Sequence, residues 1–141
     1  CERNPVVLAL LEDGLRRAAS LPGLVSAIGR MHLLAIDAGD YLASDQACVH
    51  DVVVLDPMFP ERGKSALVKK PMRLFHGLVG GDEDAGSLLE LALRRARRRV
   101  VVKRPLHAPA LGGHEPSLSY KGKAVRFDVY LTGVGAPDHK A

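Results

Sequence analysis

The stretch that decides the fold is VVVLDPMFP, residues 52–60, where a continuous apolar run ends on an acid and a proline-framed turn. Residues 52–55 lack the alternation of a half-exposed strand, which is typical of a parallel strand covered on both faces. Asp56 then follows the strand, and Pro57 stiffens the turn after it. In open α/β sheets, ligands bind beyond the carboxyl ends of the strands. The stretch therefore predicts a parallel sheet with a ligand at its edge.

Helical and strand patterns alternate on both sides of this stretch. Asn4 and Pro5 predict the N-cap and first position of a helix, and Leu-Pro-Gly at 21–23 predicts its end. The helices are predicted over 5–20, over 65–80 with a break at Pro71, and over 84–98, with a short helix or loop at 38–44. The strands are predicted over 30–36, 51–56, 99–103, 117–120 and 123–131, with a loop over 107–116. This order indicates a layered α/β fold, a mostly parallel sheet that ends in a C-terminal antiparallel hairpin.

The bulk composition is that of one modest domain, predicted to span residues 1–141. The chain is 47% hydrophobic and 26% charged, which excludes a disordered polymer, and no apolar run approaches the roughly 20 residues of a membrane span. Cys1, Cys48 and the six histidines lack metal-ligand spacing. We therefore expect a cytoplasmic protein with reduced thiols and no metal site.

Two basic clusters indicate a polyanionic partner. Residues 94–105 carry seven basic residues and no acid, and residues 64–73 carry four basic residues. Contacts between such side chains and phosphates release counterions and add affinity. Solvated helix faces with arginines near a helix C-terminus remain an alternative explanation.

Acids follow three of the predicted strands or strand ends, namely Glu2, Asp37 and Asp56. An acid after an early strand commonly binds the ribose hydroxyls of a nucleotide-like cofactor. Three of them predict a small polar ligand that lies across the strand tips. Three unrelated turn acids remain the alternative, because aspartate readily starts a turn.

The turn itself is more specific. Asp56-Pro57-Met58-Phe59 resembles the D/N-P-P-Y/F motif of class I S-adenosylmethionine-dependent methyltransferases that modify exocyclic amines of nucleobases. The resemblance implies that the Asp56 side chain and the Pro57 carbonyl accept hydrogen bonds from the target amine. It also implies that Phe59 stacks on the base, which has been brought out of its duplex or loop.

The wider sequence resembles the bacterial 16S ribosomal RNA guanine-N2 methyltransferases of the RsmJ type. The resemblance covers nearly the whole chain and is carried by VVVLDPMFP, KSALVKKPMR, VVVKRP and KAVRFDVY, with Met58 at the second proline position as in that family. It implies a Rossmann-like class I methyltransferase sheet, S-adenosyl-L-methionine as cofactor, and 16S ribosomal RNA or the small ribosomal subunit as partner. The family's glycine-rich loop is not found before Glu2, so we expect the chain to be the C-terminal portion of the domain.

The resemblance also implies roles for single residues. Glu2 and Arg3 match cofactor-contacting positions, with Glu2 on the ribose. Asp37 and Ala38 match positions on the adenine side, and Asp56 lies near the methionine portion of the cofactor. The positions that we assign to RNA phosphates, on charge alone, are Lys64, Lys69, Lys70, Arg73, Lys103 and Arg104.

Three other functions compete with this interpretation. The first is a non-catalytic RNA-binding α/β module, and the second is an amino-methyltransferase that acts on another nucleic acid. A P-loop hydrolase would need G-x-x-x-x-G-K-[ST], which this sequence lacks. Binding of the cofactor separates the first alternative from a methyltransferase, and methylation assays separate the second.

Overall fold

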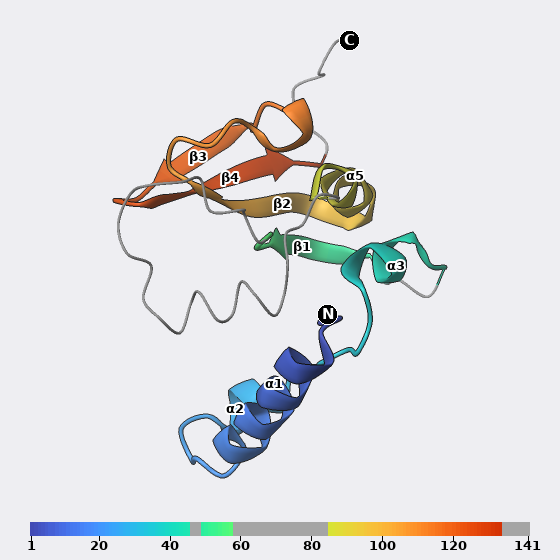
Figure 1. The fold of residues 1–141 in the computed structure, drawn as a ribbon, viewed down its shortest axis with the longest axis vertical. Coiled ribbons are helices and arrows are strands. Elements are labelled where there is room, and N and C mark those ends of the chain that lie inside the picture. Colours follow the sequence, from blue (N-terminus) through green and yellow to red (C-terminus); the bar gives the residue numbers. More distant parts are fainter. Residues whose placement is uncertain (46–48, 58–84, 134–141) are drawn as a thin grey trace. The chain divides into compact units, whose positions relative to one another are not determined.

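The computed structural model describes residues 1–45, 49–57 and 85–133 (Figure 1). The chain divides into two compact units, Cys1–Gln46 and Ala47–Ala141, and each is described by itself below. The helix predicted over 65–80 lies outside the described residues. Within the described ranges, no helix combines the length and the apolar character needed to cross a membrane.

The described part of the first unit contains three helices, of which the sequence predicted the one at its start and a short helix or loop at 38–44, but not α2. Helix α1 (Pro5–Ala18) begins after Asn4, whose side-chain oxygen accepts hydrogen bonds from the amides of Val6 (3.0 Å) and Val7 (3.2 Å). Pro5 occupies the first turn, where its missing N–H leaves no donor to satisfy. Helix α2 (Val25–Ile28) contacts α1, and α3 (Ala38–Ala43) follows.

The prediction of a strand over residues 30–36 is wrong. Residues 31–35 form no strand, and Met31 and Leu34 are 56% and 38% exposed. A single backbone hydrogen bond, from the Glu2 amide to the Leu34 carbonyl (3.0 Å), resembles those that join paired strands. An apolar run becomes a strand only where a neighbouring strand pairs with it along its length, and residues 1–45 contain none.

The second unit carries a mixed four-stranded sheet. Figure 1 shows its strands side by side in the order β1-β2-β4-β3. Strand β1 (His50–Leu55) runs parallel to β2 (Ala96–Pro105), whereas β4 (Val125–Leu131) runs antiparallel to both β2 and β3 (Leu118–Lys121). The predicted α/β fold and the C-terminal antiparallel hairpin are confirmed. Among the described strands, the parallel part is the β1–β2 pair.

Helix α5 (Ala85–Arg95) ends three residues earlier than predicted. Ala96 already belongs to β2, where its carbonyl accepts a hydrogen bond from the Thr132 hydroxyl (2.8 Å). The Thr132 amide donates to the Arg98 carbonyl (3.0 Å). Alanine and arginine both favour a helix, but intrinsic propensity is weak compared with tertiary contacts, so these hydrogen bonds and the pairing of β2 decide the conformation of residues 96–98.

The core of the second unit lies between α5 and the sheet. Leu89 and Ala92 of the helix and Val100 and Val102 of β2 are completely buried, and α5 contacts both β1 and β2. The apolar run of β1 predicted a strand covered on both faces. In the described part of the chain one face is open, since Val54 is 65% exposed. The buried face of the β1–β2 pair is therefore the face that α5 covers. The loop after β2 continues into the short 3-10 helix η1 (Leu111–Gly113), which also contacts α5.

The cap of α1 provides a test of the first unit. In the complete protein, Asn4→Ala should lower the free energy of unfolding by about 1 kcal/mol, because the amides of Val6 and Val7 lose their acceptor. Asn4→Ser, which keeps a capping oxygen, is the control and should retain most of the stability. Urea unfolding followed by circular dichroism measures both. Equal midpoints for the two variants would show that the cap is not needed.

Candidate functional site

The first part of the candidate site is the carboxyl end of β1, where that strand lies beside β2. Leu55 pairs with Val102, so the next residues along the two parallel strands, Asp56 and Lys103, lie beside each other. The Lys103 ammonium donates a hydrogen bond to Asp56 Oδ2 at 2.8 Å. Their side chains are 41% and 62% exposed, whereas Pro57 is buried. Asp56 is thus at the sheet edge, as predicted, with its carboxylate held from one side.

Arg104 lies next to Lys103 but in a different environment. Alternate residues of β2 are buried, and Arg104 is only 5% exposed, on the same face as Val100 and Val102. Its guanidinium donates to the Pro109 carbonyl in the loop that follows the strand. This burial argues against the phosphate-contacting role assigned to Arg104 from charge. Charge patterns in a sequence do not show which face of a strand a residue occupies.

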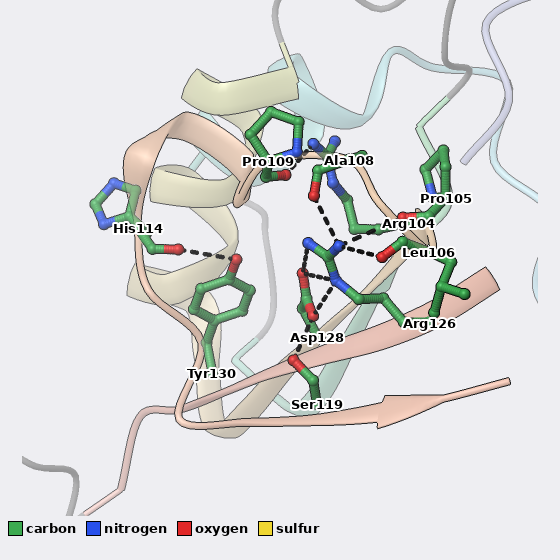
Figure 2. A network of polar contacts seen from close by, with 10 residues as sticks. All are labelled: Arg104, Pro105, Leu106, Ala108, Pro109, His114, Ser119, Arg126, Asp128 and Tyr130. Carbon is green, nitrogen blue, oxygen red and sulfur yellow. Dashed lines mark hydrogen bonds and ion pairs between the residues drawn. The ribbon is translucent and has the colours of Figure 1, made fainter.

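A buried polar network holds the loop that leaves this edge (Figure 2). Arg126 of β4 donates from Nη1 to the carbonyls of Leu106 (2.8 Å) and Ala108 (2.7 Å). Its Nε and Nη2 atoms donate to the Asp128 carboxylate, each in a bond of 2.9 Å. Asp128 is completely buried and also accepts from the Ser119 hydroxyl at 2.6 Å. The network therefore ties β3, β4 and the loop after β2 together.

The ionisation of these groups follows from their contacts. Burial raises the pKa of Asp128, but hydrogen bonds from Arg126 and Ser119 and the charges of Arg126 and Arg104 outweigh it and hold the pKa below its usual value. The hydrogen bond to Asp128 raises the pKa of Arg126. Burial, with the nearby Asp128 charge, raises the pKa of Tyr130, whose hydroxyl donates to the His114 carbonyl at 3.2 Å. Asp128 is therefore an ionised carboxylate in the interior.

Sequence reasoning missed this network. Arg126 and Asp128 are two residues apart on a strand, so they share one face, and opposite charges on one strand face are a usable signal. What the sequence does not show is that this face is covered, because the cover comes from the 106–116 loop.

The predicted cofactor residues of the first unit form a second group. The Glu2 carboxylate accepts a hydrogen bond from the Asn4 amide through Oε1 (2.7 Å), a bond that does not use Oε2. Asp37 is more fully engaged: Oδ1 accepts from the amides of Gly39 (2.7 Å) and Asp40 (3.3 Å), and Oδ2 accepts from the Arg3 guanidinium at 2.9 Å. Asp37 is thus the N-cap of α3, and Ala38 is the first residue of that helix.

These bonds set the charge of Asp37. Burial raises its pKa, but the hydrogen bonds from Arg3, Gly39 and Asp40 outweigh it and lower the pKa from its usual value. A carboxylate that binds the two hydroxyls of a ribose should be fixed in place and have an oxygen that can accept their hydrogen bonds. Glu2 meets this requirement, because the Asn4 amide bonds to Oε1 only. Asp37 fits it less well, because both of its oxygens already accept hydrogen bonds within the fold.

The structure therefore brings together Arg3 with Asp37 in one unit and Asp56 with Lys103 in the other. The remaining predicted site residues lie outside the described residues, namely Phe59, Lys64, Lys69, Lys70 and Arg73. Over residues 1–45, 49–57 and 85–133, no group of three or more His, Cys, Asp or Glu side chains could hold a metal ion.

Comparison with known proteins gives a consistent set of relatives. A family model described as "Putative SAM-dependent methyltransferase" matches residues 1–132. The chain is 57% identical over 133 residues to a ribosomal RNA small subunit methyltransferase J of Thioalkalivibrio sulfidiphilus, a match that covers 94% of this chain and 52% of the relative. The protein of the same name from Pseudomonas paraeruginosa is 53% identical over 129 residues, which cover 92% of this chain and 49% of the relative.

A solved structure agrees with the sequence matches. The crystal structure of a SAM-dependent methyltransferase from Neisseria gonorrhoeae superposes with a TM-score of 0.70 at 38% identity, over 97% of this chain and 56% of that one. The Rossmann-like fold predicted from the sequence is consistent with this likeness. The chain spans about half the length of the curated relatives that it matches.

The buried ion pair provides a test of the second unit. In the complete protein, Asp128→Asn should lower the free energy of unfolding by about 3–5 kcal/mol, because the Arg126 charge is left without its counter-charge. Ser119→Ala removes only one hydrogen bond to Asp128 and should cost about 1 kcal/mol. Denaturant unfolding measures both. If Asp128→Asn lowers the free energy of unfolding by less than Ser119→Ala does, the role given to Asp128 is contradicted.

The same carboxylate predicts a pH dependence. Because the pKa of Asp128 is lower in the folded protein than in the unfolded chain, its contribution is fully present above the unfolded pKa of about 3.9 and is lost as the pH falls through the folded value. Unfolding free energy measured between about pH 5 and pH 2 should therefore fall less steeply for Asp128→Asn than for the wild type. Parallel curves would show that Asp128 titrates normally.

Proposed function

The chain belongs to the SAM-dependent methyltransferase family, and from that premise we propose that it is part of an enzyme that methylates the exocyclic N2 amine of a guanine in 16S ribosomal RNA. The observation that carries the proposal is the position of Asp56, in DPMFP, at the carboxyl edge of β1 with its carboxylate held by Lys103. Relatives named for methylation of small subunit ribosomal RNA support the class of substrate. The guanine N2 target follows from the resemblance of the motif.

The role of the motif follows from the chemistry of the amine. The lone pair of an exocyclic amine is conjugated into the base, so the amine is a poor nucleophile until its nitrogen becomes pyramidal. The Asp56 carboxylate and the Pro57 carbonyl would accept the two N–H hydrogens and favour the pyramidal form. Preorganised acceptors of this kind stabilise a transition state without reorganisation during the reaction.

Other residues would bind and orient the reactants. Phe59 would stack on the flipped base. S-adenosyl-L-methionine, when bound, supplies an electrophilic methyl group. The amine lone pair would form the new nitrogen–carbon bond as the methyl–sulfur bond of the cofactor breaks and the sulfur leaves as a neutral thioether. The surplus amine proton would pass to the Asp56 carboxylate and then to water, which the partial exposure of Asp56 allows.

The first unit would hold the cofactor. We assign the ribose hydroxyls to Glu2, whose carboxylate is fixed by the Asn4 amide. Arg3 and Asp37 bond to each other and to the start of α3, so their contribution is to shape the turn in which Ala38 meets the adenine. Asp56 would also lie near the methionine portion, as the resemblance implies. Both units would then belong to one methyltransferase domain, in agreement with the single match over residues 1–132.

The partner is proposed to be 16S ribosomal RNA, free or within the small ribosomal subunit, in the cytoplasm. Its phosphates would be contacted by the basic residues on the C-terminal side of the motif, namely Lys64, Lys69, Lys70 and Arg73. A non-catalytic RNA-binding module would share this charge but would not need the acid and the ring of DPMFP.

Two substitutions in the complete enzyme test the proposal. Asp56→Ala removes an acceptor that acts as the amine becomes pyramidal, so methyl transfer should slow by about 100-fold or more. Phe59→Ala removes a stacking surface worth roughly 1–3 kcal/mol, so it should mainly weaken capture of the target base. Single-turnover methylation of ribosomal RNA at saturating cofactor separates the rate from the affinity. If Asp56→Ala methylates at the wild-type rate, Asp56 is only a turn residue and the proposal fails.

A further inference from the structure

In the described ranges of the chain, two exposed ion pairs link β1 and β2, and the one between Lys103 and Asp56 differs from Arg97–Asp51 in its shorter distance, 2.8 Å against 3.6 Å, and in its position at the carboxyl end of β1. Lys103 and Asp56 are 47 positions apart in sequence and are brought together by the parallel register of β1 and β2. They lie one residue beyond the Leu55–Val102 pair, where β1 ends and β2 continues to Pro105. The ammonium bonds to Oδ2 at 2.8 Å, and Oδ1 takes no part in that bond.

Stability of the fold does not account for this pair. Both side chains are substantially exposed, 41% for Lys103 and 62% for Asp56, and exposed ion pairs contribute little to folding because water screens them. The buried pair of the same sheet, Arg126 and Asp128, contrasts with it, since those side chains are 11% and 0% exposed. The side-chain hydrogen bonds that hold the loop come from Arg126 and Arg104, whereas Lys103 bonds to Asp56.

A phosphate contact does not account for the pair either. The Lys103 ammonium already has a carboxylate partner at hydrogen-bonding distance, so the two charges largely cancel toward any distant polyanion. The neighbouring basic residue, Arg104, is buried on the opposite face and gives Lys103 no support as part of a basic surface. The Lys103 ammonium thus interacts with Asp56 and not with a neighbouring basic surface.

A carboxylate on a partly exposed turn can rotate, and rotation would change where its acceptor oxygen lies. A charge-assisted hydrogen bond to one oxygen restricts that rotation and determines where the other oxygen lies. We propose that Lys103 is a positioning residue for methyl transfer, which anchors Asp56 through Oδ2 so that Oδ1 stands ready to accept from the target amine. This inference rests on the proposed function, and it assigns Lys103 to the reaction step in place of the RNA phosphates.

The proposal makes a prediction about kinetics. In the complete enzyme, Lys103→Met keeps most of the side-chain stem but removes the donor, so the single-turnover rate at saturating RNA and cofactor should fall by about 10- to 100-fold. RNA affinity and its salt dependence should stay unchanged. Lys103→Arg, which keeps a charged donor, should recover part of the rate. Lys121→Met removes the same charge from exposed β3 and is the matched control, with a wild-type rate.

A double-mutant cycle tests whether Lys103 acts through Asp56. If it does, Lys103→Met in the Asp56→Ala background should cost less than about 3-fold, because the group that it positions is gone. If Lys103→Met slows methyl transfer in the Asp56→Ala background as much as in the wild-type background, the proposal is overturned. So would weaker RNA binding with a shallower salt dependence at an unchanged rate, since that is the result for a phosphate contact.

These outcomes separate the inference from the proposed function. A wild-type rate for Lys103→Met, with a slow Asp56→Ala, would reject the positioning role and leave the methyltransferase proposal standing. A wild-type rate for Asp56→Ala would reject both. Thermal unfolding of Lys103→Met should match the wild type, which excludes misfolding as the cause of a slow reaction.

Discussion

The parallel pairing of β1 with β2 is the constraint on which the candidate site depends. Residues 52–55 align one to one with residues 99–102, so Asp56, which follows the end of β1, lies beside Lys103, while β2 continues to Pro105. A slip of one residue would turn Lys103 to the other face of the sheet, because strand side chains alternate. Burial of Val100 and Val102 against α5 prevents that slip. The core thereby sets the geometry of an exposed edge.

Two ion pairs in this sheet have different consequences because their environments differ. Arg126 and Asp128 are out of water, where a lost partner leaves a charge that nothing else can stabilise. Their network anchors the backbone of the loop that leaves β2 (Figure 2). Lys103 and Asp56 remain in contact with water, where a broken pair costs little and the carboxylate stays accessible to a ligand. The buried pair thus stabilises the fold, whereas the Lys103–Asp56 pair leaves its carboxylate accessible to a ligand.

The acids of the first unit illustrate how one residue type can have several uses. Asp37 caps α3 and bonds to Arg3, which satisfies amides that the start of a helix leaves without partners. Glu2 bonds to a single amide, so its second oxygen is not committed to that contact. Both were predicted as cofactor ligands from their position after strand-like segments. The hydrogen bonds distinguish them, since a carboxylate engaged through both oxygens has less capacity for a ribose.

The sequence by itself determined the elements whose signals are local. Asn4 and Pro5 predicted the start of α1, the apolar run before Asp56 predicted a parallel strand, and the residues around Gly122 predicted the antiparallel pair. The DPMFP motif carried the family assignment that the comparisons support. These features depend on neighbours in the chain, so a pattern of a few residues contains them. The roles of single site residues are still predictions.

Only the tertiary structure decided what depends on distant segments. The run at 30–36 predicted a strand, but in residues 1–45 no partner strand pairs with it. The helix predicted to continue to Arg98 ends at Arg95 because Thr132 bonds to the backbone of Ala96 and Arg98. Lys103 and Arg104, alike in the sequence, differ because strand alternation puts one beside Asp56 and the other in the interior. Charge and hydrophobicity are properties of a residue, whereas burial and pairing are properties of what folds against it.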